Sequence, residues 1–360
     1  MSKKNIKIYA FYNNKGGVGK TTLCFNAASL YAQKNPNTQV LVIDMCPQAN
    51  ISQFLLGGGQ QGYKTTQKLQ SLAGRKNVVG FIDWLLKGNS NFKTPNTSYK
   101  INVSSYNKHI PTNVYLIAGD SFLESLSLAL NYAVINPANT QAWKEYMTAI
   151  RRLCEYEYEY EKLENLVVFI DCNPSFSIYT QMALTSSDYL IIPMMADHSS
   201  EEGIKSILML LYDQYPSVAI KKYAENVITY NKQIKNFELK LPLIFEFVFN
   251  NYTSNQGIAN AFQSIKSELM EFCYKQFNKF PNLFYPASNV KDESDWEQYF
   301  VSDVKDFHTA GKVSAALGIP ICNLPNSTKY TMPNNNEVVI PKGNYTQAVD
   351  DVKAFVNKIL

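Results

Sequence analysis

The sequence lacks any long apolar run. Its strongest apolar stretches, residues 207–212 and 243–249, are far shorter than the roughly 20 residues that a membrane-spanning helix needs. Residues 1–7 carry lysines but lead into no apolar segment with a small-residue cleavage site, so they do not resemble a secretory signal. We therefore expect no transmembrane helix, and we expect the protein to act in the cytoplasm.

Paired metal ligands are also missing. The six cysteines are scattered without a CxxC pair, and several lie in apolar stretches where free cysteine behaves as a small hydrophobic side chain. The three histidines are isolated from one another. This pattern argues against a cysteine-bound metal and against a disulfide framework.

Arginine is rare in this chain. Lysine and arginine together number 34, and only Arg75, Arg151 and Arg152 are arginines. The scarcity limits any mechanism that needs an arginine finger. Against 30 acidic residues the formal net charge is +4, so the chain is only mildly basic.

The remaining composition is that of a globular protein. Of the 360 residues, 46% are hydrophobic and 18% are charged, unlike the composition of disordered chains. We expect one domain over residues 1–360, because no segment resembles a linker between two cores. Residues 57–79, 88–113 and 323–345 are expected elaborations, and the glycine run of the first predicts a flexible loop.

Short apolar runs alternate with longer helical patterns along the chain. We expect strands at residues 6–12, 40–44, 114–118, 166–171, 189–194, 243–249 and 283–285. We expect helices at residues 21–34, 80–87, 121–132, 140–156, 180–185, 200–215, 257–277 and 312–317. Several strands are almost continuously apolar, which is typical of parallel strands covered on both faces. The pattern predicts an α/β fold with a doubly wound, mostly parallel sheet flanked by helices.

A phosphate-binding loop follows the first expected strand and precedes the first expected helix. Its glycines let the backbone curl so that N–H groups point inward, and the helix N-terminus adds its positive dipole end. Lys20 can reach the β- and γ-phosphates, and Thr21 can bind Mg²⁺. The expected nucleotide-binding residues of the loop are Lys15, Gly16, Gly17, Val18, Gly19, Lys20, Thr21 and Thr22.

Two expected strands end in an aspartate. Asp44 ends the second strand, and Asp171 ends a later one after an unbroken apolar run. The carboxyl ends of the strands are where ligands bind in open α/β sheets, so both carboxylates would lie near the phosphate loop. With Thr21 they are the expected Mg²⁺ ligands. Taken alone, Asp44 could equally be a turn cap.

The phosphate loop departs from the ordinary G-x-x-x-x-G-K-[ST] pattern. Asn14 occupies the first glycine position, and an additional lysine, Lys15, stands five residues before Lys20. This form resembles the ParA/MinD-type P-loop ATPases with a deviant Walker A motif, and most resembles the ParA plasmid and chromosome partition ATPases. The resemblance extends in ordered blocks over residues 5–320 and implies ATP and Mg²⁺ as ligands.

The resemblance implies catalytic roles for Lys15, Lys20 and Asp44. Asp44 would support Mg²⁺ and the attacking water, and Asp171 would be the Walker B carboxylate. Lys15 would cross a dimer interface and stabilise charge on the partner's phosphates, as an arginine finger does elsewhere. Cys46 and other substitutions in the segment after Asp44 depart from the family's pattern and concern the rate or switching of that loop.

Two later segments concern the base. Residues 249–252 resemble the family's Asn-x-Tyr segment, and the Asn250 amide offers both a donor and an acceptor to the adenine edge. No Asn-Lys-x-Asp guanine signature occurs, so ATP is preferred over GTP. Residues 285–290 are a weaker expectation for a loop packed against the base.

The resemblance implies a partition ATPase. Such a protein forms a homodimer with ATP, binds DNA without sequence preference, and hydrolyses ATP slowly until a ParB-like centromere-binding adaptor stimulates it. We expect a cytoplasmic, nucleoid-associated protein. The lysines that could contact DNA phosphates are Lys205, Lys221, Lys222, Lys232, Lys235, Lys240 and Lys266.

A MinD-like membrane-associated positioning ATPase is the alternative. It would use a basic amphipathic C-terminal helix, and the apolar side chains of residues 348–360 do have helical spacing. Asp350 and Asp351 on the polar side favour a helix that packs into the core, so a membrane partner is not expected. A transcriptional repressor would need a helix-turn-helix, for which we expect no room before Lys15.

Overall fold

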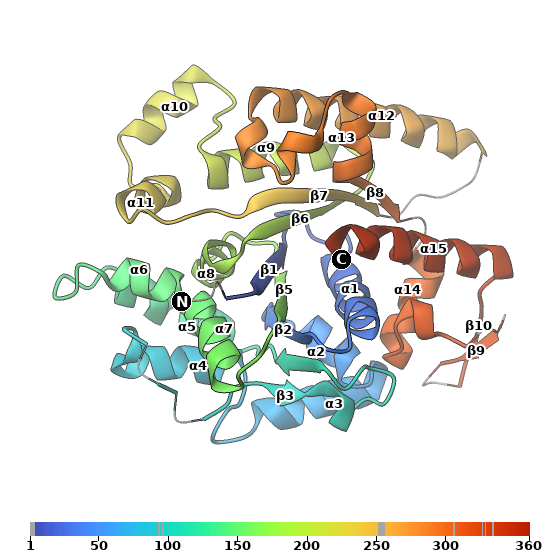
Figure 1. Cartoon of the computed structure of the whole chain (residues 1–360), viewed down its shortest axis with the longest axis horizontal. Coiled ribbons are helices and arrows are strands. Elements are labelled where there is room, and N and C mark those ends of the chain that lie inside the picture. The colour runs from blue at the N-terminus through green and yellow to red at the C-terminus, as the bar shows by residue number, and fades with distance from the viewer. Residues whose placement is uncertain are drawn as a thin grey trace.

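A sheet of eight strands runs through the molecule (Figure 1). The computed structural model describes residues 4–92, 94–95, 97–250, 256–304, 307–325, 327, 329–332 and 335–360. The strands lie in the order β3-β4-β2-β5-β1-β6-β7-β8, and all neighbours are parallel except β3 and β4. Their bounds are β1 (Ile6–Phe11), β2 (Gln39–Met45), β3 (Ile101–Asn102), β4 (Val114–Ile117), β5 (Leu166–Cys172), β6 (Tyr189–Met194), β7 (Leu243–Asn250) and β8 (Val301–Val304). The predicted fold class, a mostly parallel doubly wound sheet, is confirmed.

Helices cover both faces of this sheet. Ile8 and Ala10 of β1 pack in one apolar cluster, whereas Tyr9 and Phe11 pack in the other, because successive side chains of a strand point to opposite faces. The first cluster includes side chains of α4 (Val78–Trp84), α5 (Leu123–Val134), α6 (Ala142–Met147), α7 (Ala149–Tyr160), α8 (Ile178–Ser186), α9 (His198–Tyr212), α11 (Tyr230–Asn236), α12 (Gln256–Lys279) and α13 (Glu293–Phe300). The second includes side chains of α1 (Lys20–Lys34), α2 (Asn50–Leu55), α3 (Gly59–Gln70), α14 (Phe307–Leu317) and α15 (Lys342–Ile359).

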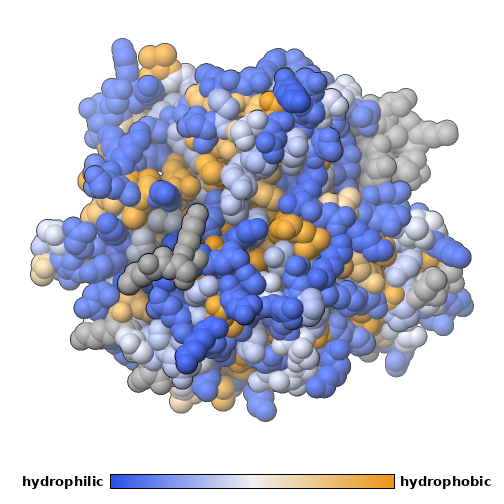
Figure 2. Space-filling view, in the orientation of Figure 1, coloured by the Kyte–Doolittle hydropathy of each residue, from blue (hydrophilic) through white to orange (hydrophobic). Residues whose placement is uncertain are grey.

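One helix stands apart from these layers. α10 (Val218–Glu225) buries only Ala224 among its residues and projects from the body of the molecule (Figure 1). Hydrophilic residues predominate on the face drawn in Figure 2, with apolar residues in patches between them.

The C-terminal helix α15 packs into the core. Its buried side chains include Val352, Phe355 and Ile359, and the Phe355 ring lies edge-on to Phe11 with centroids 6.3 Å apart. The apolar stripe of the sequence is therefore a packing stripe, as expected, and does not form a free amphipathic helix. Within the described ranges, no helix is long and apolar enough to cross a bilayer. The single-domain organisation over residues 1–360 stays a prediction.

The expectation of a strand at residues 283–285 is wrong. A 3₁₀ turn at Pro281–Leu283 comes first, and Phe284 then makes one isolated bridge to Ile244. The edge position next to β7 is taken by β8, which the sequence analysis did not predict. The helix expected at 140–156 is also two helices, α6 and α7.

The expectation of a flexible loop over residues 57–79 is wrong as well, because this segment contains α3. Its glycines serve close packing instead. A Cβ on Gly58 would lie 2.2 Å from the backbone nitrogen of Gly318, and one on Gly62 would lie 2.0 Å from the carbonyl oxygen of Gln53. The third elaboration, residues 323–345, holds a separate hairpin of β9 (Lys329–Thr331) and β10 (Glu337–Val339).

Candidate nucleotide-binding site

The phosphate loop connects β1 to α1. Gly17 and Gly19 have φ angles of 77° and 87°, which glycine adopts without steric strain. Lys20 opens α1, and its buried Nζ donates a hydrogen bond to the carbonyl oxygen of Lys15 at 2.9 Å. Burial lowers the pKa of Lys20 from its ordinary value. The loop is thus curled with its lysine turned toward it, as a phosphate cradle requires.

The other expected loop residues surround this cradle. Gly16 is exposed like Gly17, Val18 is buried beneath the loop, and Thr21 and Thr22 lie half-buried in the first turn of α1. The structure therefore brings the whole predicted set to one point at the start of α1.

Asp171 lies beside Thr21. The Thr21 hydroxyl donates a hydrogen bond to Asp171 Oδ2 at 2.8 Å. The second oxygen, Oδ1, is buried and has no hydrogen-bond partner among the described residues. Burial, and then the neighbouring charge of Asp44, raise the pKa of Asp171 to about 8. An oxygen ligand without a partner, next to a hydroxyl and a phosphate cradle, fits a hard cation such as Mg²⁺.

Asp44 stands directly opposite Asp171, because β2 and β5 pair in that register. Its carboxylate accepts hydrogen bonds from the Cys46 N–H at 3.0 Å, from the Ser52 N–H at 3.1 Å and from the Ser52 hydroxyl at 2.6 Å. Burial raises its pKa to about 6. A Cβ on Gly119 would lie 2.7 Å from the Asp44 carboxyl carbon, so only glycine fits there. Asp44 is therefore held in one place from three sides.

Lys15 does not point freely into solvent. Its Nζ forms an ion pair with Asp197, the N-cap residue of α9, whose side chain also accepts from the Ser200 N–H at 2.9 Å. Partial burial raises the pKa of Asp197, but the hydrogen bonds from Lys15, Ser199 and Ser200 outweigh it and lower the pKa below its ordinary value. Within one chain, an ion pair thus holds Lys15 at the start of α9.

Asn250 ends β7 and contacts the phosphate loop. Its amide nitrogen donates to the Val18 carbonyl oxygen at 3.2 Å, and its buried Oδ1 has no partner in the described part of the chain. A Cβ on Gly19 would lie 1.8 Å from the same amide nitrogen. That Asn250 contacts the adenine base stays a prediction. The atom available for this contact is Oδ1, because the amide nitrogen is already bonded to Val18. Residues 251–255 lie outside the described residues.

The expectation that residues 285–290 pack against the base is wrong for Tyr285. Tyr285 donates its N–H to the Ile244 carbonyl oxygen at 3.0 Å, and its ring lies 5.0 Å from that of Tyr189. Tyr189 and Ile244 stand at the starts of β6 and β7, whereas Asn250 ends β7. Tyr285 therefore lies at the opposite edge of the sheet from the phosphate loop.

The sequence did not predict three residues of the site, namely Ser52, Gly119 and Asp197. Ser52 follows Asp44 by only eight positions, so its hydroxyl is the one local signal in the sequence. Gly119 and Asp197 come from distant segments and reach the site only through the fold.

This fold and this site define a P-loop nucleotide-binding protein of the ParA type. The chain belongs to the family described as AAA domain, whose model matches residues 6–217. The chromosome partitioning protein ParA of Caulobacter vibrioides is 26% identical over 208 residues, covering 58% of this chain and 63% of that protein. An uncharacterised protein of Pseudomonas putida is 28% identical over 208 residues, covering 56% of this chain. The match spans only 61% of that relative's own length.

A solved structure shares the fold over the full chain. The putative plasmid partition protein BB_S35 of Borrelia burgdorferi, bound to AMPPNP, superposes with a TM-score of 0.51 at 20% identity. The superposition covers 99% of this chain and 100% of that one. The ParA-like arrangement of the sheet and its helices thus extends beyond residue 217, where the family match ends.

Proposed function

We propose that this protein is a ParA-like partition ATPase that binds ATP with Mg²⁺ and hydrolyses it slowly. The observation that carries the proposal is the Thr21 hydroxyl bonded to Asp171, with Asp44 in register beside it. A hydroxyl and two buried carboxylates beside a phosphate cradle are a donor set suited to a magnesium nucleotide. The AMPPNP in the Borrelia neighbour supports ATP as the ligand.

Each residue of the site then has one task. Lys20 holds the β- and γ-phosphates, and Thr21 and Asp171 hold Mg²⁺, which supplies positive charge to the phosphates when bound. Asp44, fixed by its hydrogen bonds, orients the attacking water. Asn250 presents Oδ1, which has no partner among the described residues, to the amino group of adenine.

Lys15 serves the ATP-bound homodimer in this proposal. In one chain it is paired with Asp197, and in the dimer it reaches the phosphates of the partner subunit. A cation next to the transferring phosphate stabilises the charge that develops there. The rarity of arginine is compatible with a lysine in this task.

In this proposal, DNA binding without sequence preference uses fewer lysines than the sequence predicts. Lys205, Lys235 and Lys266 are each paired with a carboxylate, and the Lys232 Nζ donates to three backbone carbonyls. Among the described residues, the exposed members of the set that form no ion pair are Lys221, Lys222 and Lys240. We assign the DNA contacts to these, and we propose that a ParB-like adaptor stimulates hydrolysis on the nucleoid.

The test is ATP-dependent retention of random-sequence duplex DNA, measured from about 50 to 200 mM salt. We expect binding with ATP but not with ADP, a steep loss with salt, and a weaker salt dependence in a Lys221→Ala/Lys222→Ala variant. Lys68→Ala, an exposed lysine of α3, is the matched control. ATP-dependent binding to anionic vesicles without DNA retention would contradict the partition reading and favour the MinD-like alternative.

A further inference from the structure

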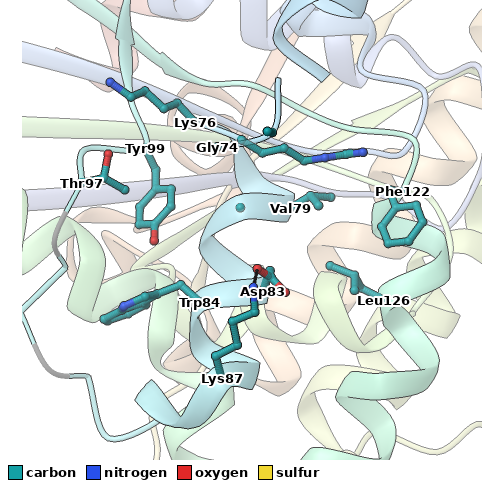
Figure 3. Close-up of a pocket in the computed structure, with 13 residues that line it drawn as sticks. Gly74, Lys76, Val79, Asp83, Trp84, Lys87, Thr97, Tyr99, Phe122 and Leu126 are labelled. Carbon is teal, nitrogen blue, oxygen red and sulfur yellow. Dashed lines mark hydrogen bonds and ion pairs between the residues drawn. The ribbon is translucent and has the colours of Figure 1, made fainter. Parts of the chain in front are cut away.

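A cavity of about 610 Å³ lies between α4, α5 and the connecting segments before and after α4 (Figure 3). No residue of the phosphate loop lines it. Trp84 and Tyr99 stand on one side, and Phe122 and Leu126 stand across from them. Phe122 keeps 49% of its surface exposed although it is aromatic. The size is that of a site for a small molecule or a large side chain, and the walls are partly apolar and partly polar.

Three cations line this space, and two of them are paired with carboxylates. The lining contains Arg75, Lys76 and Lys87 but only one carboxylate, Asp83, which pairs with Lys87 at 2.6 Å. Arg75 pairs with Asp120 and lies 5.4 Å from the centre of the Phe122 ring. Lys76 is exposed and forms no ion pair with any described residue. An occupant with an aromatic ring for the apolar part of the wall and a negative charge for Lys76 would therefore match the cavity.

The turn that carries one wall of the cavity also supports the nucleotide site. Asp120 accepts hydrogen bonds from the Arg75 guanidinium at 2.6 Å and from the Phe122 N–H at 2.9 Å. The preceding residue, Gly119, donates its N–H to the Ser52 hydroxyl at 2.9 Å. That hydroxyl in turn donates to Asp44 at 2.6 Å. A shift of this turn would therefore change the hydrogen bonding of Asp44.

We propose that this cavity is the docking site for an aromatic side chain of a partner protein, carried in a segment with acidic residues beside it. The side chains of Trp84 and Phe122 would receive the ring, and Lys76 at the rim would meet a carboxylate. A double helix is too wide to enter, and a lipid bilayer offers no single ring to a concave site. The binding itself does not depend on the proposed function, whereas an effect on ATP turnover, through the turn to Asp44, does rest on it.

The test uses the full chain without nucleotide and a phage-displayed library of random 12-residue peptides. We expect enriched peptides that carry Trp, Phe or Tyr next to Asp or Glu. Leu126→Trp fills the cavity, and Lys76→Glu reverses the rim charge, so each should weaken a selected peptide at least about tenfold. Leu128→Trp on the same helix and Lys64→Glu on α3 are matched controls, because both residues are exposed and lie outside the lining. Phe122→Ala, at the half-exposed mouth, gives a second variant if Leu126→Trp fails to fold.

The outcomes separate clearly. Three results would each overturn the docking site. The selected peptides could lack an aromatic residue or acidic neighbours, they could bind Leu126→Trp as well as the wild type, or no peptide could be enriched. Displacement of the peptides by a single-stranded oligonucleotide would also overturn it, in favour of a nucleic acid base. In a second arm, a bound peptide should change phosphate release by the wild type but not by Leu126→Trp. Binding without that change would remove the link to Asp44 and leave the docking site standing, and a protein without ATPase activity would contradict the proposed function alone.

Discussion

Asp44 and Asp171 end neighbouring strands in register, yet the chain surrounds the two carboxylates differently. Asp44 receives three hydrogen bonds from its own chain, whereas Asp171 receives one, from Thr21, and keeps an oxygen without a described partner. Both are buried, and their pKa values are raised to about 6 and about 8. The comparison indicates that hydrogen bonds from the chain already orient Asp44, whereas Asp171 keeps an oxygen that the proposed Mg²⁺ would contact.

The largest expected effect is that of Asp44→Ala. We expect ATP affinity to stay within about threefold and turnover to fall about 100-fold or more, because the variant keeps the phosphate cradle and loses the residue that we propose to orient water. Fluorescent-nucleotide titration and phosphate release measure the two quantities. Lys20→Ala should instead lose nucleotide binding. Normal turnover in Asp44→Ala would show that Asp44 has no catalytic role.

Asp171→Asn tests the proposed role of Asp171 in holding Mg²⁺. The amide can still accept the Thr21 hydroxyl, but it offers no charge to Mg²⁺, so we expect ATP affinity in Mg²⁺ to fall about tenfold or more. Affinity in EDTA should change little. Asp188→Asn, on the loop before β6, is a matched control away from the site. Equal loss of affinity with and without Mg²⁺ would contradict the metal role.

The two carboxylates and the phosphate loop could be predicted from the sequence because each belongs to one continuous segment. A strand ending in aspartate and a glycine-rich loop before a helix carry their meaning locally. Gly119 could not be predicted this way. Its role depends on β4 lying beside β2, which places the turn after β4 against Asp44.

In the fold, too, features carried by one continuous segment could be predicted, whereas features that depend on distant segments could not. The buried central strands β2 and β5 appeared as apolar runs, whereas β3 has two residues and β8 begins directly after α13 without a turn signal between them. The glycines near residue 58 indicated a loop because glycine usually does so. Here they permit backbone contact with Gly318, a contact between segments far apart in the chain.

The raised pKa values of the two carboxyls predict how the free energy of unfolding depends on pH. The unfolded carboxyls titrate near 3.8, so the folded protein binds more protons than the unfolded chain up to about pH 6 at Asp44 and about pH 8 at Asp171. Stability without nucleotide or metal should therefore fall as pH rises through this window, and between pH 6 and 8 Asp171 should account for about 1 to 3 kcal/mol of the loss. Urea unfolding from pH 5 to pH 8 measures it. Asp171→Asn should flatten the curve between pH 6 and 8, and an unchanged slope in that variant would contradict the burial argument.

The smallest expected effect concerns Lys15, whose partner Asp197 is partly exposed. Asp197→Asn keeps the α9 cap, since an amide oxygen can still accept the Ser200 N–H, but it removes the charge that holds Lys15. Exposed ion pairs contribute about 0 to 1 kcal/mol, so freeing Lys15 should tighten ATP-driven dimerisation only about twofold to fivefold. Light scattering with size exclusion on the Asp44→Ala background measures the dimer at several concentrations. Asp213→Asn is the matched control, because it removes an ion pair with Lys235 at the other end of α9. Lys15→Ala should abolish the dimer while retaining monomeric ATP binding. If Asp197→Asn weakens the dimer or leaves it unchanged, the ion pair does not compete with the partner's phosphates for Lys15.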